Sequence, residues 1–245
     1  MIRRFIAKIS PTYQLVKAQN EKINYLTHEL DNIHKKLTYL YIKHGAGSSL
    51  ESGERQVFDN VDSFRLDHRE RYEFAMKTIT EDSHVLDIAC GVGYGCHFIS
   101  EVSGTQVTGV DISEDAIQFA KKHFSQDNIS FICSSVEAYN PDRKFDFVTS
   151  FETIEHIEDD YGFVTKIFTW MNTGGVLLCS VPNEDKLPHS HSRFPFHFKH
   201  YTESDLDNLL RSVGFSEISY FSQVLDTEGI KDGTEGHFIL AIARK

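Results

Sequence analysis

Cysteine is scarce in this sequence, and the spacing of the cysteines excludes two kinds of cysteine-dependent fold. The 245 residues contain four cysteines, at positions 90, 96, 133 and 179, and no two of them form a CxxC pair. The sequence therefore predicts neither a disulfide framework nor a zinc ribbon. No apolar run reaches the roughly 18 residues of a membrane span, and no signal peptide precedes a small-residue cleavage site. We expect a reduced, soluble protein of the cytoplasm.

Basic residues are too few for a protein that coats nucleic acid. The chain has 25 Lys and Arg against 36 Asp and Glu, which gives a formal net charge of -11. Phosphate binding needs a dense basic face, so we expect no nucleic-acid partner. The hydrophobic fraction of 40% is that of a globular protein, and the length suits one large domain with or without an appendage.

The charge is unevenly distributed along the chain. Residues 1–50 hold eight Lys and Arg but only three Asp and Glu, so the excess of negative charge lies after them. A segment over 44–49, rich in glycine and serine and without an apolar period, marks the boundary. We therefore predict an N-terminal helical arm over residues 1–44 and a globular domain over residues 45–245.

Apolar residues repeat along the arm with the spacing of a coiled coil. From Ile23 to Leu40 they alternate at three and four positions. A helix this short is marginal in water, so we expect burial against a partner chain in a homo-oligomer; packing on its own domain is the alternative. Residues 1–10 place apolar side chains beside three basic ones and can lie on the inner face of an anionic membrane. A frayed terminus is the alternative there.

The rest of the sequence alternates strand-like and helix-like stretches, which is typical of an α/β fold with a mainly parallel sheet. Strands are expected over 84–89, 106–111, 128–133, 144–151 and 174–181, with a closing antiparallel pair over 215–221 and 237–243. Helices are expected over 94–102, from residue 113, around 163–171 and over 202–213. The last is capped by Thr202 or Ser204 and ended by Gly214.

A glycine-rich turn follows the first of these strands. Gly91, Gly93 and Gly95 allow the backbone to approach a ligand and to enter a helix whose amino end favours negative charge. Such a turn alone also fits dinucleotide oxidoreductases or a plain tight turn. Two aspartates make the pattern more specific: Asp87 lies inside the strand, and Asp111 lies 20 residues beyond Gly91. A carboxylate at the position of Asp111 can accept both hydrogens of a ribose diol.

These segments, with those over 145–159 and 174–183, resemble the class I S-adenosylmethionine-dependent methyltransferases over about residues 55–245. The resemblance implies a Rossmann-like, doubly wound α/β fold with a seven-stranded, mainly parallel sheet. It also implies S-adenosyl-L-methionine as the cofactor, with its amino-acid part against Asp87, Ala89 and Gly91 and with Gly93 close by.

The same resemblance assigns the adenosine side of the cofactor. Asp111 would hold the ribose hydroxyls, with Ile112 against the adenine, and Phe151 would close the pocket. Ser135 and Val136 fall where the family contacts the adenine amino group. Serine departs from the usual Asp or Glu there, so backbone groups or Glu137 are the alternative.

A narrower resemblance covers residues 52–75, which are similar to methyltransferases encoded with bacterial surface-polysaccharide assembly. It implies a saccharide acceptor and a glycan-assembly partner, with Arg71 and Tyr72 over the methionine end of the cofactor. Ordinary helix packing is the alternative for this pair. Methylation of an amino group or of a small lipid-like acceptor, and an inactive coiled-coil scaffold, are the alternatives for the function.

Transfer of a methyl group to an alcohol needs a base that is placed to remove the proton. Glu155 and His156 follow the fourth strand, where open α/β sheets place their ligand crevice, and His197 lies in a histidine-rich stretch after the fifth. These three are the candidate catalytic residues. Satisfaction of a helix terminus by His156, and packing of the site floor by His197, are the alternatives. His189 with His191, or His197 with His200, can pair as metal ligands, but no complete three-ligand set has a characteristic spacing. The sequence therefore predicts no required metal.

Overall fold

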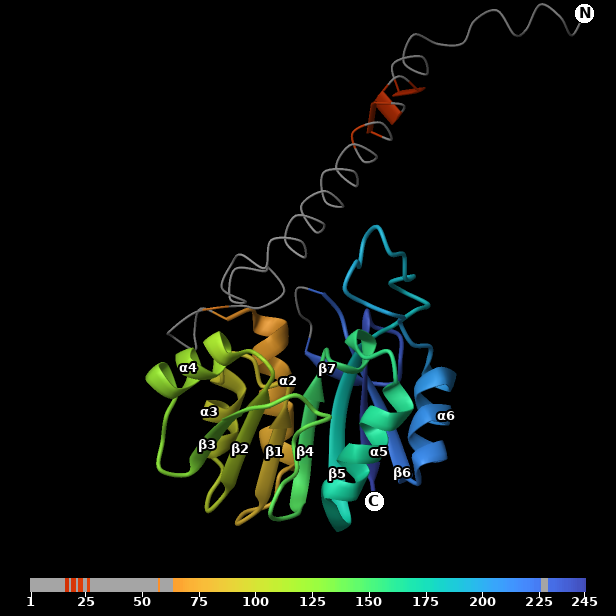
Figure 1. Cartoon of the computed structure of the whole chain (residues 1–245). Coiled ribbons are helices and arrows are strands. Elements are labelled where there is room, and N and C mark those ends of the chain that lie inside the picture. The colour runs from red at the N-terminus through yellow and green to blue at the C-terminus, as the bar shows by residue number, and fades with distance from the viewer. Residues whose placement is uncertain are drawn as a thin grey trace, which may run out of the picture. The chain divides into compact units, whose positions relative to one another are not determined.

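The computed structural model describes residues 64–225 and 229–245, residue 57, and the isolated positions 16, 17, 19, 20, 22, 23 and 26. The chain divides into two compact units, residues 1–46 with 190–195 and residues 47–189 with 196–245. All the helices and strands named below belong to the second unit (Figure 1). The predicted coiled-coil arm over 1–44 lies almost entirely outside the described residues, among which the seven isolated positions are helical.

The second unit is built on a single mixed sheet of eight strands in the order β3-β2-β1-β4-β5-β8-β6-β7. Its first five strands in the chain are parallel, and the remaining three are antiparallel. The strands are β1 His84–Ile88, β2 Gln106–Asp111, β3 Ile129–Cys133, β4 Phe145–Phe151, β5 Met171–Pro182, β6 Ser216–Gln223, β7 Ile230–Asp232 and β8 Phe238–Arg244. The helices are α2 Leu66–Thr78, α3 Tyr94–Ser100, α4 Glu114–His123, α5 Asp160–Trp170 and α6 Glu203–Val213, with the short 3₁₀ helix η4 Ile154–His156.

Alternating residues of the central strands divide the interior into two cores. Val85 of β1 and Phe147 of β4 belong to the core that also contains residues of α2, α3 and α4. Leu86 and Val148 belong to the other, with residues of α5 and α6. Successive strand residues point to opposite faces, so the continuous apolar character of these strands reflects burial on both sides.

The order in which the chain adds strands reverses between β1 and β4, and open α/β sheets have their ligand crevice at such a point. From β1 the chain passes outward through β2 and β3, and it then returns to pair β4 on the opposite side of β1. The loops at the carboxyl ends of β1 and β4 therefore diverge, which is where open α/β sheets bind ligands. The sequence motifs around Gly91 and Glu155 both lie in these loops.

The structure corrects the predicted sheet in two places. The sheet has eight strands rather than seven, because β7 adds a three-residue edge strand antiparallel to β6. Its short, partly polar sequence carries no periodic signal. Met171, expected in the preceding helix, is the first residue of β5. The helix over 202–213 is confirmed as α6, with Thr202 in a capping box and Gly214 left-handed at its end.

Among the described residues, no helix combines the length and the apolarity needed to cross a bilayer.

Helix α2 packs closely on α3 because of one glycine. A Cβ built on Gly95 would collide with the ring of Tyr72. That ring cannot easily retreat, since its hydroxyl donates to Asp87 and its faces meet Tyr94 and Phe151 edge-on. The absence of a side chain at position 95 therefore sets the separation of the two helices.

We expect Gly95→Ala to destabilise the protein by about 1–3 kcal/mol, the usual cost of an overpacked core, despite the higher helix propensity of alanine. The midpoint of urea unfolding measures the change. Asn208→Ala, on the exposed side of α6, is the matched control and should shift stability by no more than about 0.5 kcal/mol. Equal stabilities of Gly95→Ala and wild type would contradict this account of the α2–α3 contact.

Candidate functional site

The turn after β1 is built from three residues with left-handed backbone. Ala89, Gly91 and Gly93 have φ angles of 62°, 56° and 86°. A Cβ built on Gly91 would meet nothing within 4 Å, whereas one on Gly93 would lie 2.6 Å from the Cβ of Ala120. The two glycines thus serve different purposes. Gly93 permits close packing against α4, and Gly91 leaves open space beside its backbone for a ligand.

Asp111, at the end of β2, is joined directly to this turn. Its carboxylate accepts hydrogen bonds from the backbone N–H groups of Gly91 (2.9 Å) and Ser113 (2.8 Å) and is 3% exposed. Hydrogen bonds from two peptide groups give the carboxylate one orientation. The neighbouring Ile112 is 69% exposed, so an apolar side chain lies at the surface beside a fixed negative charge.

Asp87 is directed away from solvent. Its carboxylate accepts hydrogen bonds from Thr149 (2.7 Å), Tyr72 (3.2 Å) and the thiol of Cys96 (3.5 Å). Burial raises the pKa of this carboxyl to about 6, against the lowering effect of these three donors. Asp87 therefore positions the Tyr72 ring and supports the turn from below. Ala89, two residues on, carries a left-handed backbone at a non-glycine residue, a conformation that functional turns often retain.

The segment after β3 contains Ser135 and Val136. Both are half-buried, and the carbonyl of Ser135 accepts from the amides of Ala138 (3.2 Å) and Tyr139 (2.9 Å). Lys166 of α5 donates to the carbonyl of Val136 (3.3 Å), which fixes the turn. Ser135 thus shapes its own loop through its backbone. Glu137, the alternative adenine contact, is exposed, and hydrogen bonds from its own backbone N–H and from Ser135 lower the pKa of its carboxyl.

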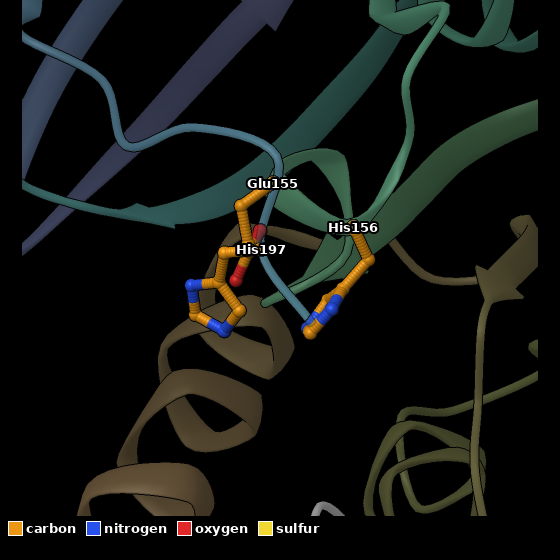
Figure 2. Close-up of side chains that lie close together, drawn as sticks. All are labelled: Glu155, His156 and His197. Carbon is orange, nitrogen blue, oxygen red and sulfur yellow. The ribbon is translucent and has the colours of Figure 1, made fainter. Parts of the chain in front are cut away.

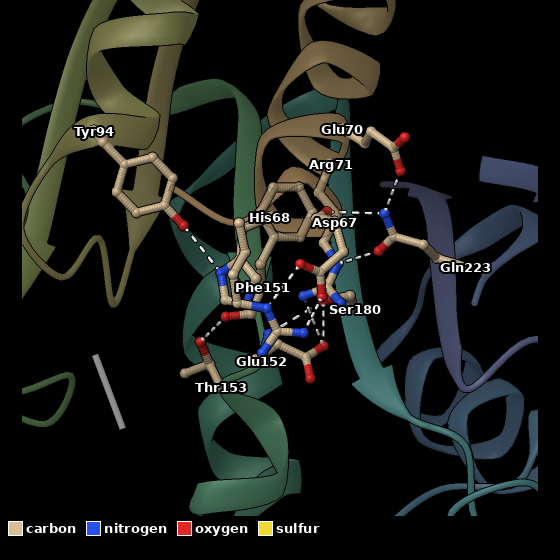
Figure 3. A network of polar contacts seen from close by, with 11 residues as sticks. Asp67, His68, Glu70, Arg71, Tyr94, Phe151, Glu152, Thr153, Ser180 and Gln223 are labelled. Atoms are coloured by element: carbon tan, nitrogen blue, oxygen red, sulfur yellow. Dashed lines mark hydrogen bonds and ion pairs between the residues drawn. The ribbon is translucent and has the colours of Figure 1, made fainter. Parts of the chain in front are cut away.

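A buried arginine lies at the centre of a polar network between α2, the end of β4 and β6 (Figure 3). Arg71 is 1% exposed; its Nε donates to Gln223 (2.8 Å), and its Nη1 is 3.3 Å from a carboxylate oxygen of Glu152. Gln223 donates in turn to the backbone carbonyl of Asp67 and to Glu70. Among the described residues, neither terminal nitrogen of Arg71 has a hydrogen-bond partner. Glu152 supplies a counter-charge for the buried guanidinium, and the hydrogen-bonding capacity of its two terminal nitrogens stays unfilled.

Glu152 begins the loop after β4 with strained backbone. Its φ angle is 48°, and its backbone N–H donates to the carbonyl of Ser180 (3.2 Å), whose hydroxyl donates to the Glu152 carboxylate (2.7 Å). A left-handed residue that is not glycine or asparagine is costly and is retained where the surrounding structure fixes it. Phe151, just before it, meets the Tyr72 ring edge-on at 5.0 Å between centroids.

The candidate catalytic residues come together on the other side of this loop. Glu155 and His156 lie in η4, and His197 lies in the segment after β5; one ligand atom from each is within 4.8 Å of the other two (Figure 2). The amide of Phe198 donates to the carbonyl of Glu155 (2.7 Å), which holds the two segments together. Glu155 is fully buried. The structure thus brings together side chains from two separate segments of the chain. His156 and His197, the nearest pair in sequence across the two segments, are 41 positions apart.

Hydrogen bonds determine the orientation of both imidazoles. The Nδ1 of His156 lies 3.0 Å from the carbonyl of Phe196, so Nδ1 is the donor. His200 donates from Nδ1 to the carbonyl of Leu187, which makes its Nε2 the acceptor for Nδ1 of His197 at 2.8 Å. Burial, followed by repulsion from neighbouring histidines beginning with His156, lowers the pKa of His197 to about 3. In His156 and His197, Nε2 is therefore the nitrogen that can accept a hydrogen bond.

One detail of this region differs from the sequence-based hypotheses. His197 and His200 bond to each other, so they do not form a ligand pair around a common ion. The neighbouring acidic residues belong to the start of α5: Asp159 caps the helix, and Asp160 accepts from Tyr201 and pairs with Lys199. The orienting role of His200 was missed, because a bond between two histidines leaves no mark on sequence spacing.

Comparison with known proteins identifies the family of this domain. A family model described as "Methyltransferase domain" matches residues 56–220, about two thirds of the chain. A Mycolicibacterium smegmatis protein named "probable S-adenosylmethionine-dependent methyltransferase" is 32% identical over 153 residues, covering 61% of this chain and 55% of that protein. A ubiquinone biosynthesis O-methyltransferase of Coxiella burnetii is 34% identical over 119 residues, covering 47% of this chain and 50% of that protein. The chain thus spans about half the length of these curated relatives.

A solved structure with the same fold contains a relevant ligand. The N-methyltransferase NodS from Bradyrhizobium japonicum, in complex with S-adenosyl-L-homocysteine, superposes with a TM-score of 0.57 at 16% identity, covering 75% of this chain and 89% of that one. Likeness at this identity concerns the fold, whereas the family model covers the glycine turn, Asp111 and the loop after β4 directly. By that match, the chain belongs to the family of S-adenosylmethionine-dependent methyltransferases with a Rossmann-like methyltransferase domain.

Proposed function

We propose that the protein is an S-adenosylmethionine-dependent O-methyltransferase whose acceptor is a sugar hydroxyl of a surface glycan or its precursor. Cofactor binding is supported above all by the hydrogen bond from the Gly91 amide to the Asp111 carboxylate. An open glycine turn lies beside a carboxylate that the turn itself orients. A ribose diol donates two hydrogen bonds to such a carboxylate, and the open space beside Gly91 admits the atoms that follow the ribose.

The remaining donor contacts follow from this placement. Adenine would lie between the exposed Ile112 and the loop of Ser135 and Val136. Tyr72 and Phe151 would border the methionine end, beyond Ala89 and Gly93. The residues present fit the group at this end as well. The methionine part carries a carboxylate, and the terminal nitrogens of the buried Arg71 lack a hydrogen-bond partner among the described residues.

The acceptor side contains the groups that an alcohol requires. Methyl transfer is an in-line displacement at the sulfonium carbon, and alignment of acceptor oxygen, methyl carbon and sulfur supplies much of the rate. A sugar hydroxyl must also lose its proton as it attacks. A carboxylate oxygen and two imidazole nitrogens lie close together after β4 and β5, next to the crevice; they belong to Glu155, His156 and His197. An alcohol keeps its proton at neutral pH and needs a group at this position to take it, which is the support for an O-acceptor.

The saccharide assignment rests on the resemblance of residues 52–75 and on the polar and aromatic residues Phe196 and His197 in the segment after β5. The heptad pattern of residues 23–40 supports assembly of the chains, or docking to a glycan-assembly partner, through the arm over 1–44.

Asp111→Asn should weaken binding of S-adenosylhomocysteine about 10- to 100-fold, because hydrogen bonds to a charged group contribute about 1.5–3 kcal/mol. Isothermal titration calorimetry measures the dissociation constant. Asp115→Asn, an exposed substitution four residues along in α4, is the matched control and should bind like wild type. Unaltered affinity in a folded Asp111→Asn protein would refute the ribose contact.

Arg71→Met removes the guanidinium group and its charge and keeps an unbranched side chain about as long as the aliphatic part of arginine. We expect it to weaken S-adenosylhomocysteine binding at least 10-fold while leaving 5′-methylthioadenosine binding unchanged, because only the former carries the methionine carboxylate. Parallel titrations with the two ligands give the comparison. Equal losses for both ligands would mean that Arg71 supports the fold and does not contact the carboxylate.

His156→Ala and His197→Ala should each lower kcat about 10²–10⁴-fold, the usual contribution of a group that handles the reacting proton. Donor binding should remain intact, because both residues lie on the acceptor side. A glycan array with methyl-labelled donor identifies the acceptor, and single-turnover assays on it give the rates. Full activity of both variants would remove their assignment, and labelling of amines alone would overturn the O-acceptor.

A further inference from the structure

We propose that Glu155, His156 and His197 form a binding site for a divalent first-row transition metal ion of the zinc type, with an open position for the acceptor hydroxyl. This inference rests on the proposed function and deepens it, because it identifies what activates the hydroxyl. The cluster draws on η4 after β4 and on the segment after β5, and Figure 2 shows the three side chains converging. It reverses the expectation from sequence that no metal is required.

The spacing of the three side chains suits a common ion. Their ligand atoms all lie within 4.8 Å of one another. Donor atoms at about 2.0–2.2 Å from a tetrahedral ion are about 3–4 Å apart, so a small inward movement of the side chains completes the site. The backbone already sets most of this geometry. Glu155 and His156 are consecutive in η4, and the amide of Phe198, next to His197, donates to the carbonyl of Glu155.

The hydrogen bonds behind the two rings match those that support metal-binding histidines. Such a histidine donates its remote ring N–H to a carbonyl or a carboxylate, which fixes the tautomer and directs the other nitrogen at the metal. His156 donates from Nδ1 to the carbonyl of Phe196, and His197 donates from Nδ1 to His200, which is anchored on Leu187. Both Nε2 atoms are thereby assigned as acceptors, the form that a metal requires.

The carboxylate supplies the third ligand. Glu155 is fully buried beside two imidazoles, and a carboxylate oxygen is a ligand that zinc-type ions take together with histidine nitrogens. Two neutral imidazoles and one carboxylate carry a net charge of −1, so a divalent ion would leave the site with a charge of +1, which favours a bound alkoxide.

The donor set identifies the class of ion. Two imidazole nitrogens and one carboxylate with an open position suit Zn²⁺ and similar first-row ions, whereas Mg²⁺ prefers oxygen ligands and retains its waters. The acceptor hydroxyl would take the open position and lose its proton to solvent at a lower pKa. Its oxygen then forms a bond to the methyl carbon as the carbon–sulfur bond breaks, and neutral S-adenosylhomocysteine leaves.

The test uses the full-length protein after dialysis against a chelator. Titration with Co²⁺, which has visible absorption bands that depend on its ligands, should give one site with the spectrum of an ion held by nitrogen ligands. Calorimetry with Zn²⁺ should give the same stoichiometry, and Mg²⁺ should bind at least 100-fold more weakly. His156→Ala, His197→Ala and Glu155→Gln should each weaken Zn²⁺ binding about 100-fold or more. His200→Ala, which removes only a supporting bond, should weaken it about 10- to 100-fold.

The exposed His191→Ala is the matched control and should bind Zn²⁺ like wild type. Circular dichroism and binding of S-adenosylhomocysteine show that each variant is folded. A Co²⁺ spectrum identical to that of the hydrated ion, or unchanged Zn²⁺ affinity in the three ligand variants, would overturn the metal site. In that case retained donor binding and retained dependence of methylation on His156 would leave the proposed function standing, with the imidazoles acting as bases directly.

Discussion

One buried carboxylate connects the elements on the donor side of the crevice. Asp87, near the end of β1, accepts hydrogen bonds from Tyr72 of α2, Thr149 of β4 and Cys96 of α3. Burial opposes its ionisation, and these donors offset part of that cost. Because the Tyr72 hydroxyl is held here, its ring has a defined place against Gly95 and beside Phe151. Helix α2, and with it Arg71, is thereby fixed against α3 and the end of β4.

The two sides of the crevice are constructed in different ways. On the donor side, the backbone does most of the work: left-handed residues shape the turn, and two peptide N–H groups orient Asp111. On the acceptor side, side chains from separate loops converge, and the geometry depends on bonds between rings and carbonyls. A cofactor shared by a whole family suits the first construction. An acceptor that varies among relatives suits the second, since loop side chains change without disturbing the sheet.

The loop after β4 joins these two sides. Its first residue, Glu152, has strained backbone and is held by Ser180 and Arg71, and three residues later Glu155 enters the acceptor cluster. The loop is short, so Glu152, which contacts Arg71, lies only a few peptide units from the Glu155–His156 pair. A donor that engages Arg71 and an acceptor that engages the cluster would therefore be aligned by one rigid segment, which is the requirement for in-line transfer.

The sequence by itself determined the local features whose physical cause is local. Apolar runs located the five parallel strands, Thr202 and Gly214 marked the ends of α6, and the glycines located the turn that Asp111 contacts. The use of that turn for a nucleoside stays a prediction. Edge strand β7 escaped because three partly polar residues have no detectable period. Met171 was misplaced because an apolar residue at the junction of α5 and β5 suits either element.

Only the tertiary structure decided which distant side chains meet. The bond between Arg71 and Gln223 spans 152 positions, and the meeting of Glu155 with His197 requires two loops to lie side by side at the carboxyl edge of the sheet. Spacing rules for metal ligands describe residues close together in sequence, so they carry no signal for three side chains that come from two strand ends. The orientation of each imidazole depends on backbone carbonyls, whose positions the order of amino acids does not reveal until the chain is folded.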